Sequence, residues 1–205
     1  MQQLVQRFHL KVTGILHIGA HECEELRDYL AVGVDAGKTY WVEAMPDKVA
    51  FCQAKYGKGL HIYQAVIDET DGAEVTFNIT NNGQSSSILE FGSHSTSHPH
   101  VHVVEKVAMT TTRMDTLIDR EQIPIERLNF VNLDIQGVEL RALKSMEKYL
   151  QHVQYIYTEV NTEQVYQGCN LIGEIDIYLR GFGFERVAQQ IYKEYGWGDA
   201  FYIKH

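Results

Sequence analysis

The chain of 205 residues carries a formal net charge of −9 and is 44% hydrophobic, which predicts one α/β domain with its own core over residues 1–205. The chain is acidic and has no long block of Lys and Arg, so we do not expect it to bind nucleic acid. No apolar stretch reaches the roughly 18 residues of a membrane-spanning helix, so we do not expect it to cross a membrane. Three scattered cysteines and an N-terminus without an apolar leader predict a reduced, cytoplasmic setting.

The first part of the chain alternates short apolar runs with helical periodicity. Strands are predicted over 15–18, 40–44 and 60–66. A helical spacing of apolar residues predicts one helix over 22–34, and Pro46 begins a second helix that Gly57 ends. Strands that alternate with helices are typical of a parallel sheet covered on both faces.

This rhythm changes after residue 67. Residues 74–80 and 101–112 alternate apolar and polar side chains, and Asn82-Gly83 marks a turn between them. We therefore predict an antiparallel β-hairpin inserted over about residues 68–112. Its tip, over 83–99, is rich in Ser, Gly and His, and we expect it to form a lid over a bound ligand.

Regular order then returns, with strands predicted over 129–134 and 153–160, helices over 137–150 and 173–180, and an antiparallel pair over 184–191 and 200–203. The whole pattern predicts an α/β fold built on a doubly wound, mostly parallel seven-stranded sheet. In such sheets ligands bind at the carboxyl ends of the strands, near the point where the strand order reverses.

The turn after the first strand has the layout of a nucleoside-binding βαβ unit. It contains Gly19, Ala20 and His21, and the next strand ends at Glu43, which we expect to accept the two ribose hydroxyls. Glu43 could instead cap the helix that Pro46 begins.

The same turn is unsuited to a diphosphate. It has one Gly, and we expect its acids to fall in the first two turns of the following helix, where they would repel phosphates. These acids are Glu22, Glu24, Glu25 and Asp28. A nucleoside with a positive tail fits better, so S-adenosylmethionine is the predicted ligand.

Two further carboxylates end neighbouring strands, at Asp134 and Glu159. Such a pair could take a proton from an attacking hydroxyl, hold a divalent metal, or bind substrate hydroxyls without proton transfer. Asp134 could also cap the helix that follows. The predicted catalytic residues are Asp134, Glu159 and His21. The predicted cofactor-binding residues are Gly19, Ala20, His21, Glu22, Glu43, Ala44, Val66, Asp68 and Asp134; the predicted acceptor-binding residues are Ser86, Ser87, His94 and Asn161.

The histidines of the hairpin tip at 94, 98, 100 and 102 match no metal-site spacing that carries weight, so we predict no resident metal. His94 or His98 could instead act as a base or contact the substrate. His17 lies within an apolar strand and is expected to be a hydrogen-bonded core imidazole. Cys23 and Cys52 fall on apolar faces and are expected to pack in the core.

Seven segments in order resemble the FkbM family of S-adenosylmethionine-dependent methyltransferases, over about residues 13–187. The most specific is Leu133-Asp134-Ile135-Gln136-Gly137-Val138-Glu139, which is similar to the family's Ile-Asp-Val-Glu-Gly-x-Glu signature. His17, Cys23 and Gln136 depart from the family pattern. The segments span residues 15–25, 42–46, 65–80, 82–89, 109–118, 132–144 and 158–160.

The resemblance implies a Rossmann-like class I methyltransferase that methylates a hydroxyl on a sugar, glycan or small metabolite and releases S-adenosyl-L-homocysteine. Two alternatives stay open at this point. One is an NAD-linked oxidoreductase on the same fold. The other is a non-catalytic nucleoside-binding module that has lost turnover through His17 and Gln136.

Overall fold

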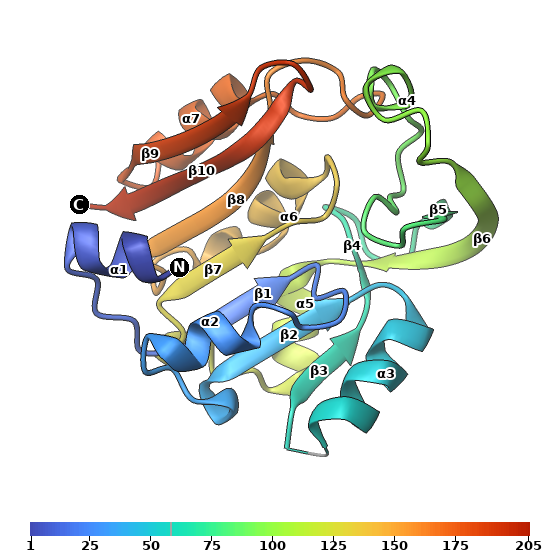
Figure 1. Ribbon diagram of the computed structural model, residues 1–205. Helices are drawn as coiled ribbons and strands as arrows, with labels where there is room; N and C mark the ends of the chain where they lie inside the picture. Colours follow the sequence, from blue (N-terminus) through green and yellow to red (C-terminus); the bar gives the residue numbers. More distant parts are fainter. Residues whose placement is uncertain (58) are drawn as a thin grey trace.

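A seven-stranded sheet in the order β3-β2-β1-β7-β8-β10-β9 organises the computed structural model, which describes residues 1–57 and 59–205 (Figure 1). Neighbouring strands are parallel from β3 to β8, and β10 runs antiparallel to both β8 and β9. The predicted doubly wound, mostly parallel sheet is therefore confirmed. In the order of the sheet the strands are β3 (His61–Gln64), β2 (Thr39–Glu43), β1 (Ile15–Ile18), β7 (Phe130–Leu133), β8 (Tyr155–Asn161), β10 (Trp197–Lys204) and β9 (Phe184–Tyr192).

Helices cover both faces of this sheet, and each face has its own apolar core. The first three helices pack on the face that contains Trp41 and Phe130, whereas α5, α6 and α7 pack on the face that contains Leu16 and Val131. The helices are α1 (Gln2–Phe8), α2 (Leu26–Ala31), α3 (Pro46–Tyr56), α5 (Met114–Glu121), α6 (Glu139–Ser145) and α7 (Ile172–Arg180). None of the helices in the described part of the chain has the length and apolar character needed to cross a membrane.

The inserted hairpin is also confirmed. β5 (Glu74–Thr80) pairs antiparallel with β6 (Val103–Thr112), and the hairpin lies beyond the carboxyl ends of the central strands of the main sheet (Figure 1). A short strand, β4 (Val66–Ile67), pairs with β6. The strand predicted over 60–66 is therefore two strands in different sheets, because β2 ends at Glu43 and leaves the chain beyond Ala65 without a partner in the main sheet.

Two predicted helices begin later than expected, for one physical reason. The chain adopts left-handed backbone angles at His21 and Cys23, so α2 begins only at Leu26 instead of residue 22. Gln136 and Gly137 likewise have positive φ, and α6 begins at Glu139 and gives way to a 3₁₀ turn at Glu147–Tyr149. A helix cannot include residues in this conformation.

Some elements were not expected from the sequence. They are α1, the four-residue α4 (His94–Ser97) in the hairpin tip, and α5, which begins two residues after β6 ends. The segment 109–118, one of the seven that resemble the family, therefore contains the end of one strand and the start of a helix. α5 is amphipathic and buries Met114, Leu117 and Ile118.

His17 is a core imidazole, as predicted. Its side chain is 2% exposed, stacks on Trp41 at 4.6 Å, and lies 2.9 Å from the hydroxyl of Tyr29. Asn132 donates to the same hydroxyl at 2.7 Å, so the buried polar atoms satisfy one another. Cys23 and Cys52 are fully buried in the same core, which confirms their packing role.

We expect the substitution His17→Phe to change the pH dependence of stability. Burial lowers the pKa of His17 from 6.5 to about 3, so between these values the unfolded chain binds a proton that the folded chain does not. Stability present above pH 6.5 is therefore lost as the pH falls towards about 3. In that window the unfolding free energy of the parent should fall more steeply than that of His17→Phe, by about 1.4 kcal/mol per pH unit. Chemical denaturation over a pH series measures this, and parallel curves would contradict a neutral His17.

Candidate functional site

A cavity of about 470 Å³ opens at the carboxyl ends of β1, β2, β7 and β8, beneath the tip of the hairpin. Its floor comes from the turns that follow these strands, and β4 adds Val66 and Ile67 to its wall. The site thus lies where the order of the sheet reverses, as expected for an open α/β sheet. Of the predicted residues, the cavity is lined by Gly19, Ala20, His21, Glu43, Ala44, Val66, Ser86, Ser87, His94, Asp134 and Glu159.

The turn after β1 is held against β7 at Gly19. Its φ is 96°, and a Cβ built on it would lie 1.8 Å from the carbonyl oxygen of Asp134. The N–H groups of Gly19 and Ala20 both donate to the carbonyl of Val42, at 2.9 and 3.0 Å. Only glycine fits this place, because any side chain would collide with the backbone of the neighbouring strand end.

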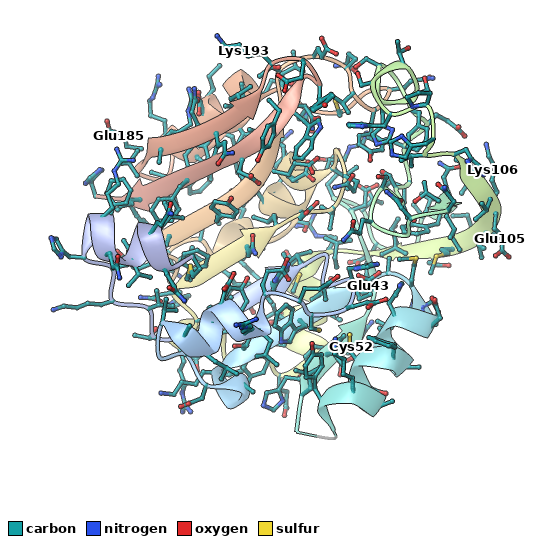
Figure 2. The ribbon with its side chains drawn as sticks, in the orientation of Figure 1. Glu43, Cys52, Glu105, Lys106, Glu185 and Lys193 are labelled. Atoms are coloured by element: carbon teal, nitrogen blue, oxygen red, sulfur yellow. The ribbon has the colours of Figure 1, made fainter. Side chains whose placement is uncertain are left out.

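Glu43 both lines the cavity and fixes the turn. One carboxylate oxygen accepts the N–H of His21 at 2.7 Å, and the other accepts the N–H of Met45 at 2.8 Å. The residue is 6% exposed, and burial raises the pKa of its carboxyl while these backbone donors oppose the shift. Figure 2 shows Glu43 at the end of β2, whereas Glu105 and Lys106 lie on the outer side of β6. The helix-capping alternative is not what the structure shows, since α3 has no side-chain cap.

Asp134 and Glu159 are joined by one amide. Nε2 of Gln136 donates to Oδ1 of Asp134 at 2.5 Å and to Oε2 of Glu159 at 2.8 Å. Asp134 is exposed to the cavity, whereas Glu159 is 7% exposed. Asp134 does not cap the next helix, because α6 begins at Glu139 after Val138. The predicted pair of carboxyls therefore exists, and the structure adds the side chain that bridges it.

The surroundings of the pair raise both pKa values. Burial raises the pKa of Glu159 well above its ordinary value, and the charges of Asp134 and Glu139 add to this effect. The walls of the cavity limit the hydration of Asp134 and raise its pKa too, although the amide of Gln136 opposes this. The state in which the two carboxyls share one proton is therefore lower in free energy than the state in which both are ionised.

Ser86 and Ser87 anchor the hairpin tip to the core. The hydroxyl of Ser86 accepts the N–H of Thr80 at 3.0 Å, and the hydroxyl of Ser87 donates to the carbonyl of Gln136 at 2.8 Å. Both residues are at most 8% exposed. Their side chains hold the wall of the cavity in place, a role that the sequence pattern did not indicate.

His94 belongs to α4 and is 6% exposed. Its ring stacks on Phe91 at 4.3 Å, and its Nδ1 has no hydrogen-bond partner in the described structure. Burial lowers the pKa of His94 to about 4, so the imidazole is neutral at neutral pH. His98 and His100 also line the cavity. Among the residues described, no group of three or more His, Cys, Asp or Glu side chains could hold a metal ion.

Three predicted residues lie outside the cavity lining. Glu22 pairs with Lys48 at 2.6 Å, and Asp68 lies 3.6 Å from Arg141. Asn161 is fully buried at the end of β8, and neither atom of its amide has a hydrogen-bond partner in the part of the chain described. These three side chains therefore lie outside the candidate site.

The sequence pattern also missed residues that line the cavity. Tyr166 comes from the loop between β8 and α7, and Trp197 is the first residue of β10. Tyr166 is 1% exposed and donates its hydroxyl proton to Oε1 of Gln136 at 2.5 Å. Tyr166 follows the strand that contains Glu159, and Trp197 lies between the two runs of the predicted antiparallel pair, so neither position by itself indicates a place in the cavity.

Comparisons with known proteins agree with this geometry. Residues 17–186 match the family model described as the methyltransferase FkbM domain. A curated relative, the 2-O-methyltransferase NoeI of Sinorhizobium fredii, is 22% identical over 176 residues, which cover 82% of this chain and 71% of that protein.

Solved structures share the fold. The structure of methyltransferase FkbM from Methylobacillus flagellatus has a TM-score of 0.58 at 12% identity, and the match covers 94% of this chain and 43% of that one. Magnesium protoporphyrin IX methyltransferase (ChlM) from Synechocystis, solved with bound S-adenosylmethionine, has a TM-score of 0.53 at 12% identity and covers 100% of this chain and 76% of that one. The fold is the Rossmann-like fold of class I methyltransferases.

We expect Gly19→Ala to destabilise the protein more than Gly33→Ala. Both glycines have positive φ, so alanine is strained at either place by about 1–2 kcal/mol. A Cβ at Gly33 meets nothing within 4 Å, whereas at Gly19 it meets the backbone of Asp134. The collision should add about 1–3 kcal/mol of lost unfolding free energy. Chemical denaturation of both variants measures the difference, and equal losses would show that the close approach costs nothing.

Proposed function

The chain belongs to the methyltransferase FkbM family, and from that premise we propose that it methylates a hydroxyl group on a sugar, glycan or other small metabolite. It is an S-adenosylmethionine-dependent methyltransferase, and the nature of the acceptor is the proposed part. The observation that carries the proposal is the carboxyl pair of Asp134 and Glu159 beside the Gly19 turn.

The cavity fits the methyl donor. Glu43 lies at the end of β2, where its free lone pairs can accept ribose hydroxyls, and Val66 and Ile67 offer an apolar wall for the adenine. Gly19 lets the turn lie directly against the backbone of Asp134, which brings the donor side of the cavity close to the carboxyl pair. These residues would hold the nucleoside, and the bound donor supplies an electrophilic methyl group.

The charge of the lining favours this donor over a dinucleotide. The described residues that line the cavity include no Lys or Arg, but they do include five carboxyls. A diphosphate would be repelled by these groups, whereas a sulfonium is attracted. Of the four acids expected in the first two turns of the helix after β1, only Glu24 and Glu25 line the cavity, and both precede α2. The five carboxyls are Glu24, Glu25, Glu43, Asp134 and Glu159.

The same charges favour a neutral acceptor. A phosphate or carboxylate on the acceptor would face the carboxylate of Asp134, and no Lys or Arg of the described lining would offset the repulsion. We therefore propose a small hydroxyl-bearing acceptor and not a nucleic acid. Trp197 is partly exposed and offers a flat apolar surface against which a sugar ring can pack, and the neutral imidazole of His94 adds no charge to this wall of the cavity.

The chemistry that the chain itself supplies is proton transfer and placement. A hydroxyl oxygen becomes a better nucleophile as its proton leaves, and Asp134 is open to the cavity and can accept that proton. General base catalysis of this kind contributes about 10²–10⁴-fold. Holding the hydroxyl near the methyl group contributes further, because it removes the entropic cost of bringing the two together.

We expect Glu43→Gln to weaken binding of S-adenosylhomocysteine by about tenfold or more, because a charged acceptor of two hydroxyl protons becomes a neutral amide. Isothermal titration calorimetry measures this, with Glu105→Gln on the exposed part of β6 as the matched control. NAD, titrated into the parent protein, should show no binding under the same conditions. Unchanged affinity in Glu43→Gln, or tight binding of NAD, would contradict the assignment of this cavity.

We expect Asp134→Asn to lower the rate of methyl transfer by about 10²-fold or more, because the acceptor loses its base. The assay measures S-adenosylhomocysteine released with a panel of neutral sugars, sugar phosphates and uronic acids. Asp47→Asn on the exposed start of α3 is the control. Turnover should occur only with neutral sugars. A parent protein that turns over none of them, or turns over the anionic ones equally well, would refute the proposed acceptor class.

A further inference from the structure

Gln136 has an unusually constrained place between β7 and α6. Its φ is 57°, in the left-handed region, and Gly137 follows with a φ of 104°. The carbonyl of Gln136 accepts a hydrogen bond from Ser87 in the hairpin tip at 2.8 Å. The backbone conformation and this bond direct the side chain towards the ends of β7 and β8, and the residue lines the cavity.

The amide of Gln136 uses all its polar atoms within the site. Nε2 donates to Asp134 and Glu159, at 2.5 and 2.8 Å, and Oε1 accepts from Tyr166 at 2.5 Å. The opposite orientation would point the amide oxygen at two carboxyls. The hydroxyl of Tyr166 lies 3.3 Å from the carbonyl of Ser85 but only 2.5 Å from Oε1 of Gln136, so its shorter bond favours the orientation in which the amide donates to the pair.

The two carboxyls differ in access. Asp134 is exposed to the cavity, whereas Glu159 is buried behind it and has a raised pKa. The charges of Glu139 on α6 and Asp199 on β10 raise the pKa of Glu159 further, whereas the charge of His21, in the turn after β1, opposes the rise in the pKa of Asp134. Among the described lining residues neither Lys nor Arg offsets this charge. A proton on the pair is therefore most stable on Glu159, and the ionised oxygen is the one open to the cavity.

We propose that Gln136 is a positioning residue of the methyl-transfer site: its amide, oriented by Tyr166, holds Asp134 as the cavity-facing base beside a protonated Glu159. This inference rests on the proposed function for the role of Asp134. A carboxylate at residue 136 could still accept from Tyr166, but it could not donate to either partner. It would place a third acid in the cluster.

The substitution Gln136→Glu tests the donation, and Tyr166→Phe tests the orientation while it keeps the ring that lies next to Phe91 and His94. The control is Gln53→Glu on the exposed side of α3, which makes the same charge change. Thermal melting and binding of S-adenosylhomocysteine first establish that each variant is folded with its donor site intact.

The first measurement needs no turnover. Carbon-13 labelling of Asp and Glu side chains lets the carboxyls of Asp134 and Glu159 be titrated by NMR in the ligand-free protein. In Gln136→Glu both midpoints should rise by about one pH unit or more relative to Gln53→Glu, and in Tyr166→Phe by less. Identical titration curves in Gln136→Glu and Gln53→Glu would overturn the proposal.

The second measurement is the pH profile of methyl transfer. Gln136→Glu should lower kcat at neutral pH by about tenfold and move the rise of kcat with pH upward, while KM for the acceptor changes little. Tyr166→Phe should lower kcat by about threefold to tenfold. A rise in KM with unchanged kcat would overturn the positioning role. Shifted NMR titrations without turnover by any acceptor would support the role of Gln136 in the cluster and refute the proposed function instead.

Discussion

The close approach of Gly19 to the backbone of Asp134 is the constraint on which the site depends. It brings the ends of β1 and β7 together at the point where the sheet reverses its order, and it allows the turn to bond to the carbonyl of Val42. Glu43 then ties the same turn to the start of α3. A backbone contact that admits no side chain thus sets the distance between the donor side of the cavity and Asp134.

The second organising property is the charge of the cavity. Burying carboxyls without cations costs free energy, which the protein reduces by sharing protons and by directing N–H groups at them. Backbone N–H groups serve this purpose for Glu43, and the amide of Gln136 serves it for Asp134 and Glu159. A positively charged ligand relieves the remaining cost, so the same arrangement that strains the free protein favours the sulfonium donor.

Much of the fold could be predicted because the apolar runs and turns are local signals. Most of the strands and the inserted hairpin were placed correctly, as was Glu43 in the cavity, whereas residues 60–66 form parts of two strands in different sheets. The start of α2 was not, because it depends on left-handed backbone at His21 and Cys23, which residue type does not announce. Gln136 was noticed only as a departure from a pattern. Its role requires Tyr166, which reaches it from 30 residues further along the chain through an irregular loop.

The two sides of the cavity come from different parts of the architecture. The main sheet builds the floor, whereas the hairpin tip and the loop after β8 build the opposite wall. This wall is joined to the floor by the hydrogen bonds of Ser87 and Tyr166 to Gln136. Exposed residues of the tip can therefore diverge during evolution without disturbing the donor side, provided these two anchors persist. Such an arrangement lets one scaffold acquire new acceptors by varying a single insertion.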